Sequence, residues 1–187
     1  MRPRVWLAAI LVCLLQTTPI AAIIVNRTVH LVHGREMVIS VIPVDPRDLF
    51  RGDYVQMNYT ISSLASSLIR APESVTPGTV IFVTFERQGQ PQDGNWVPVA
   101  ASPVRPPAQE TDNTIVLRGV TQWEWRPDRI RVEYGIESYF VPENTGHDLE
   151  KATRDGTVKA VISVTGDGKA AIKALIVAGT RHDESLF

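Results

Sequence analysis

One stretch indicates the fold most clearly: YVQMNYTI, at residues 54–61. Its apolar side chains fall at every second position, which gives the strand one continuous apolar face: Val55, Met57, Tyr59 and Ile61. A period of two is typical of a strand with one buried face and one solvated face. The same period dominates the chain beyond residue 26, so the sequence predicts an antiparallel β protein.

Further strands are expected on both sides of this stretch. They cover residues 28–32, 37–44, 79–87, 96–101, 113–126, 130–141, 157–165 and 169–177, with a bulge at Gly119 and a hairpin turn at 166–168. A loop with one helical turn is expected at 62–70, and a short helix at 146–154. The predicted fold class is all-β, an antiparallel sandwich or a partly open barrel of about eight or nine strands with one short helix.

An apolar run follows two arginines at the N-terminus. Val5–Val25 holds 21 residues without a charge, which span about 31 Å as a helix, against a hydrocarbon core of about 30 Å. We expect residues 1–25 to be a transmembrane anchor with Arg2 and Arg4 in the cytoplasm. A cleaved signal peptide is the alternative, although cleavage after Ala22 would put Ile20 where a small residue is preferred. Either way the body is exported.

The remaining residues have the size of one domain, 26–180, with a frayed tail at 181–187. The chain carries 19 basic and 20 acidic residues, so no nucleic-acid partner is expected. Its single cysteine, Cys13, excludes an internal disulfide and a cysteine-based zinc site. His30 and His33 would point to opposite faces of a strand, so no metal or other cofactor is expected.

A dense polar segment precedes the opening stretch, within PVDPRDLFRGDYVQMNY at residues 43–59. Asp45 and Pro46 favour a turn, and Gly52 supplies freedom to re-enter the sheet. Arg51-Gly52-Asp53 is interpreted as structural, because an adhesion tripeptide needs an exposed loop tip. A second polar block lies at 134–143. The candidate recognition or structural residues of the two blocks are Asp45, Arg47, Asp48, Arg51, Asp53, Tyr54, Tyr59, Glu137, Tyr139 and Glu143.

These two blocks carry a family resemblance. GDYVQMNY, at 52–59, fits the pattern G-D-Y-x-x-L-x-Y with Met57 in place of Leu, and YGIESYFVPE, at 134–143, resembles a second block of the same family. The chain resembles the GDYXXLXY-domain family, bacterial membrane-anchored proteins of unknown function. The resemblance implies one membrane helix, an extracytoplasmic domain and a multi-span membrane partner, but no catalytic residue. A weaker likeness to membrane-anchored signal peptidases lacks their serine and lysine.

The expected function is therefore an interaction or accessory domain that is anchored in a bacterial inner membrane. Its body is expected in the periplasm or otherwise outside the cytoplasm, with an integral membrane protein as partner. An envelope hydrolase is one alternative, with Asp53 paired to Glu137 or Glu143 at about 5–9 Å. A self-assembling structural subunit that forms homo-oligomers is another. Three tryptophans are interpreted as core residues rather than as a platform for sugar or peptide: Trp96, Trp123 and Trp125.

Overall fold

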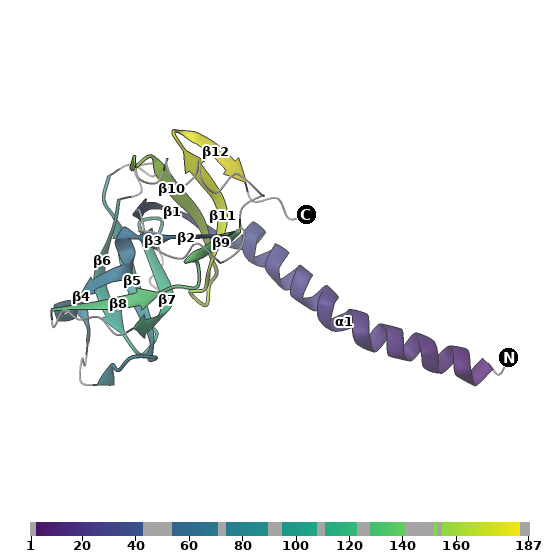
Figure 1. Cartoon of the computed structure of the whole chain (residues 1–187). Helices are drawn as coiled ribbons and strands as arrows, with labels where there is room; N and C mark the ends of the chain where they lie inside the picture. The colour runs from purple at the N-terminus through teal and green to yellow at the C-terminus, as the bar shows by residue number, and fades with distance from the viewer. Residues whose placement is uncertain are drawn as a thin grey trace.

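The computed structural model describes residues 3–42, 54–70, 74–89, 95–107, 111–122, 128–140, 152 and 155–183. Within these ranges the chain forms a long N-terminal helix, α1 (Pro3–His33), and a β body of twelve strands. Figure 1 shows α1 as a rod that projects from the body. The body is antiparallel throughout its named strands, as the alternation of the sequence predicts.

Two sheets of five strands make up most of the body. The first has the order β12-β11-β10-β1-β3 and comprises β1 (Arg35–Ile42), β3 (Asn58–Tyr59), β10 (Val158–Val164), β11 (Ala170–Val177) and β12 (Thr180–Asp183). The second has the order β4-β8-β7-β5-β6 and comprises β4 (Ser63–Ala65), β5 (Val80–Arg87), β6 (Trp96–Ser102), β7 (Thr114–Gln122) and β8 (Arg129–Glu133). A two-stranded ribbon joins β2 (Tyr54–Gln56) to β9 (Ser138–Phe140). Two 3₁₀ turns, η1 (Thr60–Ser62) and η2 (Ser66–Leu68), flank β4.

One hydrophobic core lies between the two sheets. Alternate side chains of β1, including Met37 and Ile39, join alternate side chains of β5, including Ile81, Val83 and Phe85, in a single cluster. All five are fully buried. Burying an aliphatic or aromatic side chain of this size stabilises the fold by about 1.5–3 kcal/mol. The predicted all-β class is confirmed.

Helix α1 enters the body without a linker. Gly34 alone separates its last residue from β1. Leu31 is buried, and the Ser163 hydroxyl donates a 2.7 Å hydrogen bond to the carbonyl oxygen of His30. The amide of Gly34 donates to the same carbonyl over 3.2 Å. The end of α1 is thus fixed to β10 of the first sheet.

The prediction of a strand at residues 28–32 is wrong, because this segment belongs to the last part of α1. The Thr28 hydroxyl donates a 2.9 Å hydrogen bond to the Ile24 carbonyl oxygen, four residues earlier. Threonine side chains within helices commonly make this bond. His30 and His33 therefore lie on a helix rather than on a strand. Only Gly34 lies between the helix and β1, which begins at Arg35.

Four further expectations about the strands need correction. The single strand expected at residues 54–61 is divided into β2 and β3, which belong to different sheets, and Thr60–Ser62 form the 3₁₀ turn η1. Gly119 is not a bulge, because the pairing of β5 with β7 keeps its register through that residue. The strand expected at 130–141 is divided into β8 and β9. Residues 181–183 of the expected frayed tail belong to β12, which pairs with β11. The helix expected at 146–154 lies, apart from Ala152, outside the described residues.

Candidate functional site

The two family blocks meet in the body. Strands β2 and β9 pair, with Val55 opposite Tyr139 and Gln56 opposite Ser138. Where this ribbon ends, the amide of Met57 donates to the Glu137 carbonyl over 2.7 Å. Residues 54–57 and 137–140 are therefore held side by side, although about eighty positions separate them in the chain.

Two buried tyrosines lock the blocks together. The Tyr59 hydroxyl donates to the Ile136 carbonyl over 2.6 Å, and the Tyr134 hydroxyl donates to the Ile61 carbonyl over 3.0 Å. Tyr59 thus satisfies a backbone acceptor in the second block, and Tyr134 satisfies one just beyond the end of the first. Burial, and then the nearby Glu137 carboxylate, raise the pKa of both phenols above the ordinary value. The hydroxyls therefore stay protonated at neutral pH and act as hydrogen-bond donors.

The Glu137 carboxylate serves the backbone turn between β8 and β9. Its two oxygens accept hydrogen bonds from the amides of Tyr134 and Gly135, at 2.6 and 2.8 Å. Charge-assisted bonds of this kind are about twice as strong as neutral ones. Gly135 has a φ of +80°, a conformation that glycine adopts readily. The carboxylate is committed to this turn, which leaves it poorly placed to act as a nucleophile or a general acid.

The other predicted site residues are described only in part. The side chain of Tyr139 is half-buried against the core. Tyr54 is described as part of β2, by its backbone alone. Six predicted residues lie outside the described ranges: Asp45, Arg47, Asp48, Arg51, Asp53 and Glu143. A joint recognition site formed by the two blocks stays a prediction.

Trp96 is buried, as the interpretation of the tryptophans predicts, and the Arg87 guanidinium lies 4.9 Å from its ring centroid. Trp123 and Trp125 lie outside the described residues. Among the residues that the structure describes, no group of three or more His, Cys, Asp or Glu side chains could hold a metal ion.

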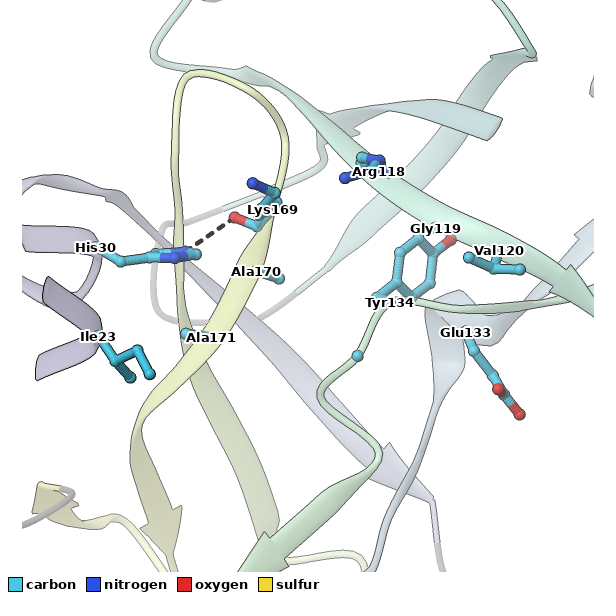
Figure 2. A pocket seen from close by; sticks show the side chains of 11 residues that line it. Ile23, His30, Arg118, Gly119, Val120, Glu133, Tyr134, Lys169, Ala170 and Ala171 are labelled. Carbon is cyan, nitrogen blue, oxygen red and sulfur yellow. Dashed lines mark hydrogen bonds between the residues drawn. The ribbon is translucent and has the colours of Figure 1, made fainter. Parts of the chain in front are cut away.

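A groove that the sequence does not predict lies beside the end of α1. It has a volume of about 520 Å³, and it is lined by Ile23 and His30 of α1, Lys169, Ala170 and Ala171 of the β10–β11 hairpin, and Arg118, Gly119, Val120, Glu133, Tyr134 and Gly135 of the second sheet. Figure 2 shows these side chains arriving from three parts of the fold. No local motif marks the groove, because its residues are distant in the sequence.

Close backbone contacts hold the groove together. The His30 ring nitrogen Nε2 lies 3.1 Å from the carbonyl oxygen of Lys169 and 3.3 Å from that of Ser163. Because both partners are acceptors, Nε2 carries the proton. The amide of Arg118 donates to the Gly168 carbonyl over 2.7 Å. The hairpin tip is thereby fixed to α1 on one side and to β7 on the other.

The fold and these contacts define a class: a mostly β protein with one N-terminal helix that is long and apolar enough to cross a membrane. The model of one protein family, described as GDYXXLXY protein, matches residues 16–175. The chain belongs to this GDYXXLXY family. Searches of curated proteins and of solved structures found no significant match.

Proposed function

We propose that this chain is a membrane-anchored accessory domain that binds an integral membrane protein on the outer side of a bacterial inner membrane. One observation carries the proposal: α1 runs without interruption from its apolar part into hydrogen bonds with the body. A flexible tether would hold a domain near the membrane in any orientation. A helix fixed at Gly34 instead presents the body at one height and one angle.

The surface of α1 supports membrane attachment. The side chains of Leu15 and Ile23 are 73% and 71% exposed, and other apolar residues of the helix resemble them. A continuous apolar surface of this size is costly in water and favourable in lipid. Thr17 and Thr18 donate hydrogen bonds to the carbonyls of Cys13 and Leu14 just before Pro19. These bonds give both hydroxyls a partner within the helix, so neither is left unpaired toward lipid.

The charges before the apolar run support the proposed orientation. Arg2 and Arg4 precede the apolar run, and positive residues beside a membrane helix favour the cytoplasmic side. The body then lies outside the cytoplasm. Membership of a family whose description states no activity leaves the partner to be identified by experiment. The engagement of Glu137 with backbone amides gives no support to the envelope hydrolase.

Site-specific photocrosslinking in native membranes tests the proposal. A photoreactive residue replaces Leu15, which is exposed on α1, and in a matched variant replaces Val104, which is 73% exposed on the body after β6. We expect the probe at position 15 to capture a multi-span membrane protein that mass spectrometry identifies reproducibly. Adducts that contain only a second copy of this chain would instead support the self-assembling subunit.

A flexible insertion tests whether the junction matters. A Gly-Ser segment placed between His33 and Gly34 separates α1 from β1 and leaves both elements intact. We expect the variant to remain in the membrane and the adduct from a probe on the body to decrease. If partner capture by the body is unchanged, rigid presentation has no role in binding.

A further inference from the structure

We propose that the groove between α1, the β10–β11 hairpin and β7 binds the phosphate headgroup of an anionic phospholipid of the membrane that α1 enters. This inference rests on the proposed membrane attachment. It assigns a ligand class to the groove, and it names Arg118 and Lys169 as the residues that bind the phosphate.

The depth of the groove is the first argument. Helix α1 has 31 residues, about 46 Å at about 1.5 Å per residue. When the apolar run begins at Val5, a hydrocarbon core of about 30 Å ends near Val25. The polar headgroup layer adds about 5–8 Å on each side. Ile23 and His30 line the groove from just inside this boundary to about 8 Å beyond it. The groove therefore opens at the level of the headgroups.

The second argument is charge. The side chains of Arg118 and Lys169 are exposed, and both residues line the groove. They are neighbours in space, because the Arg118 amide is bonded to Gly168, the residue before Lys169. Within the described part of the chain, the Arg118 guanidinium makes no ion pair. A guanidinium that is free to form two parallel bonds suits a phosphate group.

Neighbouring acids leave these cations available. Lys169 forms an exposed ion pair with Asp167 at 2.9 Å, which uses one of its three donors. The Glu133 carboxylate accepts a 2.8 Å hydrogen bond from Gln122. Figure 2 shows this carboxylate directed away from Arg118 and Lys169. Exposed pairs such as Lys169 with Asp167 are weak, so a phosphate can compete for the ammonium group.

The third argument is the apolar part of the lining. Ile23, Val120, Ala170 and Ala171 contribute apolar surface beside the two cations. Ile23 belongs to the apolar surface of α1 and is 71% exposed. A soluble anion gains nothing from contact with an apolar surface, whereas the glycerol and first acyl carbons of a lipid are stabilised by it. A lipid thus fits the groove better than free phosphate or an acidic peptide does.

The tight approach of the hairpin to β7 preserves this geometry. Gly168 has a φ of +85°, and an added Cβ would lie 3.1 Å from the Arg118 amide nitrogen and 3.2 Å from the Val116 carbonyl oxygen. His30 acts as a positioning residue, because its Nε2 proton is used by the backbone of the hairpin. The backbone segments that carry the two cations are therefore held together before any ligand arrives, which lowers the entropic cost of binding.

The test uses the full chain in a mild non-ionic detergent. Native mass spectrometry counts bound lipid during titration with phosphatidylglycerol or with phosphatidylcholine. The variants are the double substitution R118Q/K169Q, the charge reversal R118E, and the matched control R70Q/R129Q. Arg70 and Arg129 are exposed and do not line the groove. Circular dichroism establishes that each variant is folded before it is titrated.

We expect one phosphatidylglycerol per chain, and binding weakened on the order of tenfold in R118Q/K169Q. R118E should weaken binding further, and R70Q/R129Q should leave it unchanged. Equal affinity in the groove variant and in the control would overturn the inference. Full competition by soluble glycerol phosphate would also overturn it, since the site would then recognise a free anion. Tight binding of an acidic peptide in place of lipid would do the same.

Flotation separates the two possible failures. The full chain is mixed with phosphatidylcholine vesicles and centrifuged through a density gradient. If the chain does not float, membrane attachment is wrong, and the lipid inference falls with it. If the chain floats but the mass-spectrometric titration shows no preference for phosphatidylglycerol over phosphatidylcholine, membrane attachment stands and only the headgroup site is overturned.

Discussion

Maintaining the fold explains several of the polar side chains in and around the GDYXXLXY signature, because they make hydrogen bonds that hold the body together. Tyr59 closes the signature, and its hydroxyl is buried against the Ile136 carbonyl of the second block. Tyr134 opens the second block, and its hydroxyl is bonded to Ile61, just beyond the signature. Such bonds contribute about 1 kcal/mol each. Removing one leaves a buried carbonyl without a hydrogen-bond donor, which costs more. The two blocks therefore depend on each other.

The Glu137→Gln substitution should destabilise the protein by about 1–3 kcal/mol. Glutamine keeps one acceptor, but it turns an NH₂ donor toward one of the two backbone amides that the carboxylate now binds. Urea unfolding followed by intrinsic tryptophan fluorescence measures the loss. Glu86→Gln is the control, because Glu86 is exposed on β5. A normal unfolding midpoint for Glu137→Gln would show that the turn does not need the charge.

Residue-level prediction from the sequence succeeds where a single period decides the outcome. Met57, Tyr59 and Ile61 are all buried, as their alternation predicts. Alternation does not reveal that Glu137 binds the two amides of its own turn, because the turn forms only where β8 gives way to β9. Nor does it reveal Arg118 beside Lys169, since β7 and the hairpin meet through tertiary packing alone.

At the scale of elements, the junction of α1 with β1 depends on one small residue. A Cβ added to Gly34 would lie 2.0 Å from the Ser163 hydroxyl oxygen and 2.9 Å from the His30 carbonyl oxygen. Both atoms belong to the bonds that fix the end of α1. Any side chain at position 34 must therefore push the helix away from β10.

The Gly34→Ala substitution should lower stability by about 1–3 kcal/mol, the usual cost of overpacking a closely packed site. Gly166→Ala is a matched control, since its added Cβ would meet nothing within 4 Å. Thermal unfolding of the full chain in detergent compares the two variants. Equal melting temperatures would mean that the junction relaxes at no cost and that α1 is not rigidly fixed.

Strand β12 is an element that the sequence pattern does not predict. Its four residues are polar and exposed, so no apolar alternation marks them. It forms because Ala178 and Gly179 take φ values of 48° and 84°, which reverse the chain after β11. Positive φ at both central residues is typical of a type I′ turn, for which Asn-Gly is the usual sequence signal. Alanine at the first position hides that signal.

Charges that cross the first sheet should make its stability depend on pH. Glu36 of β1 lies 2.8 Å from Lys173 of β11 and 3.3 Å from Arg181 of β12. The hydrogen bond from Arg181, followed by that from Lys173, lowers the pKa of Glu36 below its ordinary value of 4.5. A lowered folded pKa means that this stabilisation is present above pH 4.5 and is lost as the pH falls further.

Glu36→Gln should therefore reduce stability at neutral pH by less than about 1 kcal/mol, because the pairs are exposed. As the pH falls below 4.5 and through the lowered pKa of Glu36, the difference from the unmodified chain should shrink and then disappear. Urea unfolding across this pH range gives the comparison, with Glu86→Gln as control. High salt should also shrink the difference at neutral pH. A pH-independent gap between the two curves would show that packing, not charge, explains the effect.

At the scale of the whole molecule, the order of parts along the chain places the groove. The N-terminal helix enters the first sheet beside β10, and the second sheet supplies β7 across from the hairpin tip (Figure 1). The sequence predicts the anchor and the β body separately, from hydropathy and from alternation. It does not predict how they join, because the join lies in a segment whose Thr, Val and His residues alternate like a strand.

The last prediction concerns the N-terminal segment itself. We expect mature protein from the membrane fraction to keep residues 1–22 and so to have the full mass of 20.7 kDa. Helix α1 is continuous across Ala22, and Ile20 occupies the position where signal peptidases prefer a small residue. Intact-mass spectrometry of the purified protein measures whether the segment is retained.

Ile20→Ala is the matched variant, because it creates a run of three alanines before Ile23 that satisfies the small-residue rule. Cleavage of this variant alone would show that Ile20 protects the anchor, whereas loss of residues 1–22 from the unmodified chain would contradict a retained membrane helix.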